Sequence, residues 1–241
     1  MLLFQAYADS LIRGEKETVS QSHTDRPATD CKLVLSWRCY FVFIFSAAVS
    51  IALLSAAVAV VTKKGGKQHR RFGKCYTAAM LCIFVTAVPL ALLTNNVFLF
   101  LIALFSFYLV FSGFRFARNK SGAPHVQDWI AVMTILLSGI GMAAFSFMLL
   151  RQGNSQWVTL IVFSLIACGL GISDFIALKN RSATGKQRIA RHLTNMLAGT
   201  IATVTAVLVT NVTTEPIWGA WLAPTVVITP VIFYWNKRTL S

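Results

Sequence analysis

Residues 63–80 read KKGGKQHRRFGKCYTAAM, and this stretch decides how the rest of the chain is arranged. Its first twelve positions hold six lysines and arginines and one histidine, and a long apolar run lies on either side. So dense a cluster of charge cannot enter hydrocarbon. The stretch therefore marks a membrane surface between two membrane-spanning segments.

The composition is that of a membrane protein. Of 241 residues, 56% are hydrophobic and only 12% are charged. Uncharged runs of about 18 residues or more recur, and a helix of that length crosses the bilayer core. The sequence therefore predicts an all-α, polytopic integral membrane helix bundle with seven transmembrane helices, at residues 39–62, 72–93, 97–117, 129–150, 157–178, 192–210 and 218–235.

Residues 1–38 precede the first span, and residues 39–241 form a single seven-helix membrane domain. The start of the chain, MLLFQAYADS, has no basic region and no apolar core long enough for a cleavable signal peptide. From Ser10 on, the tail is charged and rich in Ser and Thr. We expect this tail to lie outside the cytoplasm and to have little fixed structure.

Lysines and arginines divide unequally between the two sides of the predicted spans. The side of the N-terminal tail carries six of them, five within the tail, and the other side carries sixteen. Cytoplasmic loops are enriched in Lys and Arg, so we expect a membrane protein with its N-terminus outside and its C-terminus in the cytoplasm. The expected partners are the lipid bilayer and anionic lipid headgroups at the basic loops, and not nucleic acid.

Two spans carry an alanine at every fourth position. Ala48, Ala52 and Ala56 lie in the first span, and the sixth contains Ala198, Ala202 and Ala206. Small residues at this spacing let a neighbouring helix approach closely. We therefore expect tight helix packing on these faces. Such faces can also pack against a second copy of the chain, so a homo-oligomer is compatible with the sequence.

Two histidines, His69 and His192, stand at the cytoplasmic starts of predicted spans. Neutral imidazole is a common iron ligand, so the pair could be the axial ligands of haem b, or the rings could simply occupy the polar interface. A zinc site that adds His125, Asp128 or Asp174 lacks a recognisable ligand spacing. No nucleophile elbow, phosphate loop or dinucleotide fingerprint occurs, so nothing indicates an enzyme.

The single acid inside a predicted span is Asp174, about a turn and a half from the cytoplasmic end. Arg115 has a similar depth on the same side, near the end of the third span. We predict an intramembrane Asp174–Arg115 ion pair that joins the third and fifth spans. A proton-relay role for Asp174 and simple snorkelling to the interface are the alternatives.

The stretch from Lys64-Gly65 to Met80 carries a resemblance. Its pattern is a basic residue and Gly, then His69-Arg70, then Gly73, Tyr76 and, one turn further on, a Met. It resembles the signature of a bacterial family of predicted membrane proteins, a domain of unknown function. The resemblance covers residues 69–118 best, and it implies membership of that family and a location in the bacterial inner membrane.

Three functions remain open on the sequence alone. Pro89, Pro224 and Pro230 interrupt predicted spans, and the sixth span carries a line of polar residues. Broken helices free backbone groups near a binding site, which favours a small transporter or channel-like protein. The histidines favour a haem b-binding redox protein. A non-catalytic membrane scaffold is the third alternative.

Overall fold

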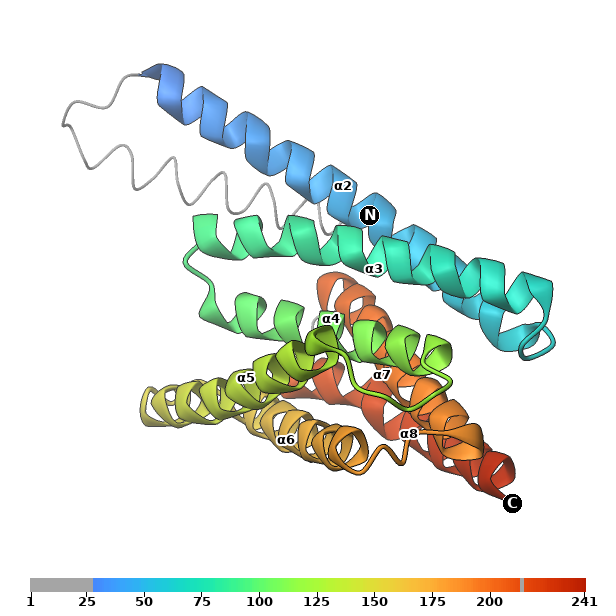
Figure 1. Ribbon diagram of the computed structural model, residues 1–241. Coiled ribbons are helices and arrows are strands. Elements are labelled where there is room, and N and C mark those ends of the chain that lie inside the picture. Colours follow the sequence, from blue (N-terminus) through green and yellow to red (C-terminus); the bar gives the residue numbers. More distant parts are fainter. Residues whose placement is uncertain (1–27, 213–214) are drawn as a thin grey trace.

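The computed structural model describes residues 28–212 and 215–241, with side chains from residue 40 onward. This part of the chain is helical and contains no strand. Each helix of this part includes a segment long and apolar enough to cross a membrane, and there are seven of them. The predicted all-α, multi-pass membrane fold is confirmed. In chain order the helices are α2 Ala28–Val61, α3 Lys67–Leu93, α4 Val97–Arg118, α5 Val126–Arg151, α6 Trp157–Lys179, α7 Gly185–Asn211 and α8 Trp218–Leu240 (Figure 1).

Several helices extend beyond the apolar runs. α3, α5 and α7 begin at Lys67, Val126 and Gly185, and α8 continues to Leu240. The spans predicted from hydropathy begin or end several residues inside these helices. The difference arises because a helix can continue past the hydrocarbon into the headgroup region, where charged residues are tolerated.

The N-terminal side of the first span differs from the expectation in the same way. α2 begins at Ala28, so residues 28–38 are helical, although the sequence predicts that they belong to a polar tail with little fixed structure. The apolar segment of this helix is Tyr40–Val61, close to the predicted span. The prediction for residues 1–27 lies outside the described residues.

Three helix pairs surround α4. α2 packs along α3, α5 along α6 and α7 along α8, while α4 contacts α3, α5 and α7 (Figure 1). The helices of each pair follow one another in the chain, and short connections favour antiparallel neighbours. α4 therefore lies in the middle of the bundle, and its buried side chains are placed to meet residues from several other helices.

Small residues bring the paired helices close together. A Cβ atom added at Gly139 of α5 would lie 2.7 Å from the sulfur of Cys168 in α6. At the contact between α2 and α3, Ala52 and Ala56 are buried against Tyr76. The alanines of the first span thus pack within the chain, as their spacing predicts.

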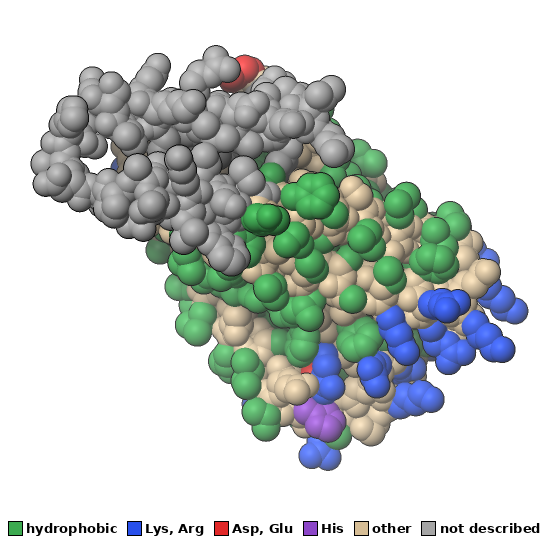
Figure 2. Space-filling view, turned by 90° about the horizontal axis from the view of Figure 1, so that it is seen from above, with side chains coloured by type: hydrophobic (Ala, Val, Ile, Leu, Met, Phe, Trp, Pro, Cys, Tyr) green, Lys and Arg blue, Asp and Glu red, His purple; other side chains and the backbone are tan. Residues whose placement is uncertain are grey.

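The outer surface of the bundle is apolar, and charged and amide groups are buried inside it. Leu137 and Val226 are 69% and 71% exposed, whereas Asp174 and Asn195 are each 2% exposed. Figure 2 shows hydrophobic side chains spread over the described part of one face. In a lipid surround this distribution is favourable only if the buried polar groups bond to one another.

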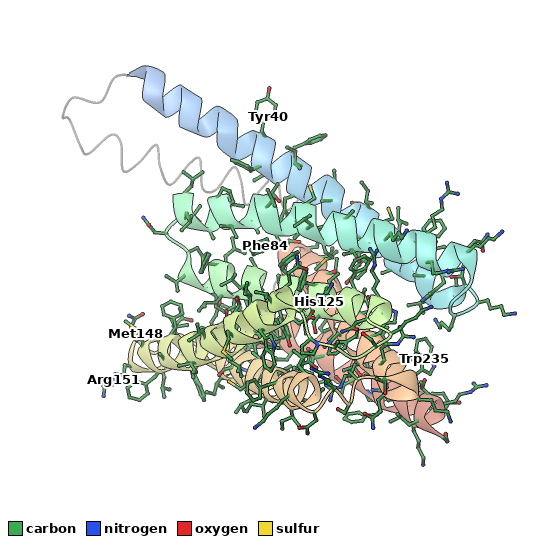
Figure 3. The ribbon with its side chains drawn as sticks, viewed as in Figure 1. Tyr40, Phe84, His125, Met148, Arg151 and Trp235 are labelled. Carbon is green, nitrogen blue, oxygen red and sulfur yellow. The ribbon has the colours of Figure 1, made fainter. Side chains whose placement is uncertain are left out.

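The basic loops and the C-terminus lie at the same end of the bundle, which we call the basic end. It comprises the last turns of α8, the loops at 62–66, 119–125 and 180–184, and the helix turns on either side of these loops. Figure 2 shows Lys and Arg gathered at one end of the molecule, and in Figure 3 Trp235 lies far from Arg151, which is at the opposite end. At the basic end the ammonium group of Lys64 lies 4.7 Å from the centre of the Trp235 ring, and partial burial lowers the pKa of this lysine.

Candidate functional site

The carboxylate of Asp174 in α6 is the centre of a buried polar cluster. Its Oδ2 accepts hydrogen bonds from the hydroxyls of Tyr108, at 2.7 Å, and Ser112, at 2.9 Å. Its Oδ1 accepts a hydrogen bond from Nη1 of Arg191 at 2.7 Å. Asn195 donates from Nδ2 to Ser112 Oγ at 3.2 Å and to Asp174 Oδ2 at 3.4 Å. We call these five residues the Asp174 cluster.

Helical spacing brings the four donors of this cluster to Asp174 from two neighbouring helices, α4 and α7. Tyr108 and Ser112 are four residues apart on α4, and Arg191 and Asn195 are four residues apart on α7. Residues at this spacing lie on one face of a helix. α4 and α7 pack together, so the two faces meet around the carboxylate of Asp174. Three helices are thereby joined by one buried acid.

The predicted ion pair between Asp174 and Arg115 does not form. Arg115 donates instead to both carboxylate oxygens of Asp128, from Nε at 2.7 Å and from Nη2 at 2.9 Å. Asp128 also accepts the backbone N–H of His125 at 2.9 Å, which caps the start of α5. Hydropathy leaves Asp128 and Arg191 at the edges of loops, whereas α5 and α7 already include them. Asp174 and Asp128 therefore each pair with an arginine that the sequence does not identify as the partner.

A small cavity separates the two ion pairs. Its volume is about 20 Å³, and its walls include Tyr108, Ser112, Arg115, Asp128 and Asp174. A space of this size holds about one water molecule. Both carboxylates line the cavity, so a single water could hydrogen-bond to the two ion pairs at once.

The structure brings the two predicted haem ligands together. The ring centroids of His69 and His192 are 6.3 Å apart, and the ring planes are inclined at 87°. Nδ1 of His69 lies 2.9 Å from the carbonyl oxygen of Ala59, and Nδ1 of His192 lies 2.9 Å from that of Gly113. A carbonyl oxygen only accepts, so each Nδ1 carries a proton, and in a neutral ring the lone pair is then on Nε2.

The third histidine of the basic end is placed differently. His125 stands at the start of α5, next to the Arg115–Asp128 pair. A zinc hydrolase needs three or four protein ligands. Within residues 28–212 and 215–241, no group of three or more His, Cys, Asp or Glu residues could hold a metal ion. The zinc alternative therefore gains no support from the described geometry.

A much larger cavity lies between α2, α3, α4, α6, α7 and α8. Its volume is about 1050 Å³, and most of its wall is apolar. The alanine row of α7, Ala198, Ala202 and Ala206, lines this cavity. The small side chains predicted to admit a neighbouring helix thus leave room for the cavity.

One buried hydroxyl in this cavity wall has no hydrogen-bond partner. Thr205 is 2% exposed and its Oγ1 forms no hydrogen bond. Elsewhere in the wall, Thr210 bonds to backbone carbonyls of its own helix. An unsatisfied buried hydroxyl is unfavourable by about 1–3 kcal/mol, so Thr205 is a natural contact for a ligand in the cavity.

Comparison of the chain with protein-family models, with curated proteins and with solved structures finds no match. The resemblance to a bacterial membrane-protein family stays a prediction on the residues that carry it. These residues nevertheless share a location. His69, Gly73, Tyr76 and Met80 follow one face of α3, and three of them meet α7, at His192, Gly199 and Thr203.

Sequence reasoning missed most members of the Asp174 cluster. Tyr108 sits in an aromatic run that reads as lipid contact, and Ser112 is a single hydroxyl in an apolar helix. Arg191 and Asn195 offered the better signal, because a cation and an amide four residues apart at a helix start suggest a polar face. Hydropathy hid this signal because the predicted sixth span begins at residue 192, which leaves Arg191 outside it.

Proposed function

We propose that this protein is a small transporter of the bacterial inner membrane whose substrate occupies the large cavity. The observation that carries the proposal is the size and reach of that cavity, about 1050 Å³ with walls from six helices. Ligand cavities are typically apolar with a few polar groups. Its walls therefore suit a largely apolar molecule with one or two hydrogen-bonding groups.

The cavity follows α7 across most of the membrane. Its wall includes Thr194 towards the basic end and Asn211 at the opposite end of the helix. At 1.5 Å per residue this stretch of α7 is about 25 Å long, close to the thickness of the hydrocarbon, about 30 Å. A substrate in the cavity would need only small movements to reach either surface.

α8 supplies the element expected to move. Pro224 and Pro230 lie inside it, and Thr225 and Thr229 beside them line the cavity. A proline in a helix lacks the N–H for the usual backbone bond and kinks the chain. Transporters bind substrates next to such interrupted helices. α8 is therefore the segment that would open and close the cavity.

The charge distribution supports the proposed location and lipid partners. Sixteen lysines and arginines belong to the basic end, against the acids Asp128 and Asp174. Arg115 and Arg191 pair with these acids. The other cations lie where anionic headgroups of a cytoplasmic leaflet would meet them.

Cysteine labelling tests the transporter proposal. In a chain whose five native cysteines are changed to alanine, Thr205→Cys is treated with a small, water-soluble maleimide. We expect Thr205→Cys to react, and we expect the added change Ala202→Trp, which fills the cavity, to suppress the reaction. Leu137→Cys is the matched control, because Leu137 is 69% exposed on the outer, lipid-facing surface.

The result is read by comparison with that control. Labelling of Thr205→Cys well above Leu137→Cys, together with block by Ala202→Trp, supports a cavity that water and solutes reach. If Thr205→Cys is as unreactive as Leu137→Cys while a cysteine placed at Asn96 is labelled, the cavity is closed, and a non-catalytic scaffold becomes the better description.

A further inference from the structure

We propose that the molecule in the large cavity is an uncharged membrane lipid with a hydroxyl headgroup, which enters from the bilayer beside α8. This inference rests on the proposed function, because it names the class of substrate that the same cavity would carry. It follows from the charge, the length and the wall chemistry of the cavity, and from the exposure of one side chain in its wall.

The wall of the cavity offers no counter-ion to a charged ligand. Among the described residues that line it, none is Asp, Glu, Lys, Arg or His. The buried ions Asp174 and Arg191 bond to each other at 2.7 Å and are not part of this wall. An ionised group without a counter-ion is strongly unfavourable in such a place. The ligand is therefore neutral, which excludes phospholipids with ionised headgroups, fatty-acid anions and amino acids.

The cavity has the dimensions of a lipid chain. It follows α7 from Thr194 to Asn211, a length of about 25 Å. Its volume of about 1050 Å³ is at the upper limit of the range of about 300–1,000 Å³ that small-ligand pockets cover. A compact molecule would leave much of this space without contacts, and an unfilled space loses van der Waals attraction. The shape therefore favours an extended ligand.

Aromatic rings line the middle of the cavity. Phe84 of α3 and Phe107 of α4 stack with ring centroids 4.5 Å apart, and Phe105 of α4 and Phe163 of α6 stack at 5.5 Å. Rings present large, rigid apolar surfaces, and an apolar chain gains many van der Waals contacts on them. The middle of the cavity therefore suits the chain of a lipid, and the headgroup belongs at an end.

The basic end of the cavity has a polar site for the headgroup. Asn236 of α8 donates from Nδ2 to Oγ1 of Thr194 in α7 at 2.7 Å, and both residues line the cavity. The Oδ1 atom of Asn236 is buried and accepts no hydrogen bond. A ligand hydroxyl would donate to this oxygen and remove the cost of leaving it unpaired. A hydroxyl headgroup therefore fits better than one that has acceptors alone.

The cavity opens towards the bilayer beside α8. Phe233 of this helix lines the cavity and is 71% exposed, so it stands at a mouth of the cavity and not deep in its wall. α8 packs along α7 and touches α6, and it is the least buried of the described spans. Phe233 precedes Asn236 by three residues, about one turn of the helix. A lipid can thus enter beside Phe233 and place its headgroup at Asn236.

The test is photocrosslinking of the full-length protein in detergent with three probes that share one diazirine-bearing chain. The probes are a monoacylglycerol, an alkyl sulfate and an alkyl trimethylammonium salt. We expect the monoacylglycerol to label the peptide that contains Phe107 about ten-fold more strongly than either charged probe, because the cavity disfavours an uncompensated charge. Ala202→Trp, which fills the cavity, should abolish this labelling. Leu137→Trp, on the outer surface, is the matched control and should leave it unchanged.

A second variant tests the headgroup site and covers the case in which Ala202→Trp fails to fold. Asn236→Asp keeps the size of the side chain and places a negative charge at the basic end of the cavity. Labelling should therefore shift from the monoacylglycerol to the trimethylammonium probe. If Asn236 had only a structural role, the change would lower the labelling by all three probes alike.

The outcomes separate this inference from the transport proposal. Equal labelling by the three probes, stronger labelling by a charged probe, or labelling that survives Ala202→Trp overturns the lipid ligand. If Thr205→Cys reacts with the maleimide and no probe labels the cavity, transport stands and the lipid substrate fails. If the cysteine is unreactive and the monoacylglycerol still labels the cavity, the lipid site stands and transport fails.

Discussion

Asp174 has one negative charge and four donors around it, and only one of those donors is a cation. The acid is 2% exposed, so these four groups, and not bulk water, solvate its carboxylate. Tyr108, Ser112 and Asn195 spread the negative charge over neutral donors, while Arg191 neutralises it. A buried ion pair with its remaining sites hydrogen-bonded is the arrangement that withstands burial.

The Asp174–Arg191 pair predicts a coupled loss of stability. Asp174→Asn and Arg191→Gln should each lower the free energy of unfolding by about 3–5 kcal/mol, because each leaves a buried charge without its counterpart. The double variant should lose less than the sum of the two. Equilibrium unfolding in mixed micelles measures the cycle.

The same cycle with Arg115→Gln in place of Arg191→Gln is the control. Arg115 bonds to Asp128 and touches Asp174 only across the small cavity, so its coupling to Asp174 should be the weaker of the two. A coupling to Arg115 equal to or above that of Arg191 would contradict the assignment of partners.

These residues show what the sequence could and could not predict at the site. Asp174 is identifiable because it is an acid inside an apolar span. Its depth is also predictable, since depth follows from position along a helix. Its partner is not, because the angle at which each helix faces its neighbours depends on packing. Arg115 and Arg191 have comparable depth, and only the contact of α7 with α4 and α6 selects Arg191.

At the scale of the elements, α7 is the helix on which the site depends. One of its faces meets α4, and another lines the large cavity. Gly199 lets it approach α4, because a Cβ atom added there would lie 2.5 Å from Cγ2 of Val110 and 2.9 Å from the hydroxyl of Tyr76. This contact leaves no room for a methyl group.

Gly199→Ala should therefore destabilise the protein by about 1–3 kcal/mol through overpacking. Gly169→Ala in α6 is the matched control, because a Cβ atom at that position meets nothing within 4 Å. That change should be neutral or stabilising by up to about 1 kcal/mol, since alanine favours a helix. The test is the melting temperature of both variants in the same detergent. An equal decrease in the two variants would contradict the close approach of α7 to α4 at Gly199.

The existence and order of the helices were predictable, and their ends were not. The seven apolar runs correspond to the seven helices of residues 28–212 and 215–241, because a helix satisfies all its backbone hydrogen bonds within one segment of hydrocarbon-buried chain. The starts of α5 and α7 were misplaced because hydropathy detects the lipid-buried part of a helix alone. Asp128 and Arg191 lie in the extensions that this measure omits, so one error about helix ends produced the error about partners.

At the scale of the whole molecule, the unequal charge of the two ends predicts the orientation. A reporter fused after Lys120 or Lys186, both at the basic end, should report the cytoplasm. A reporter fused after Asn96 or Asn154 should report the opposite side. Paired alkaline phosphatase and fluorescent-protein fusions measure this. The reverse pattern would overturn the proposed topology.

The same charge should make stability depend on lipid. Adding phosphatidylglycerol to the micelles should raise the melting temperature. The attraction between the anionic headgroups and the protein should be at most about 1 kcal/mol for each Lys or Arg near the surface. Phosphatidylcholine should have little effect. High salt should reduce the gain, because it screens exposed charges. A gain unaffected by salt would mean that headgroup charge is not its cause.

The location of the Asp174 partners also bears on how the chain is made. A ribosome completes α4 before α6, and α6 before α7. When the acid leaves the translocon, its cation is 17 residues further along the chain and has not yet reached the bilayer, but Tyr108 and Ser112 of α4 are already there. These two hydroxyls can receive the carboxylate and shield it until Arg191 arrives. A nascent chain arrested ahead of α7 should therefore insert α6 less efficiently when it carries Tyr108→Phe and Ser112→Ala.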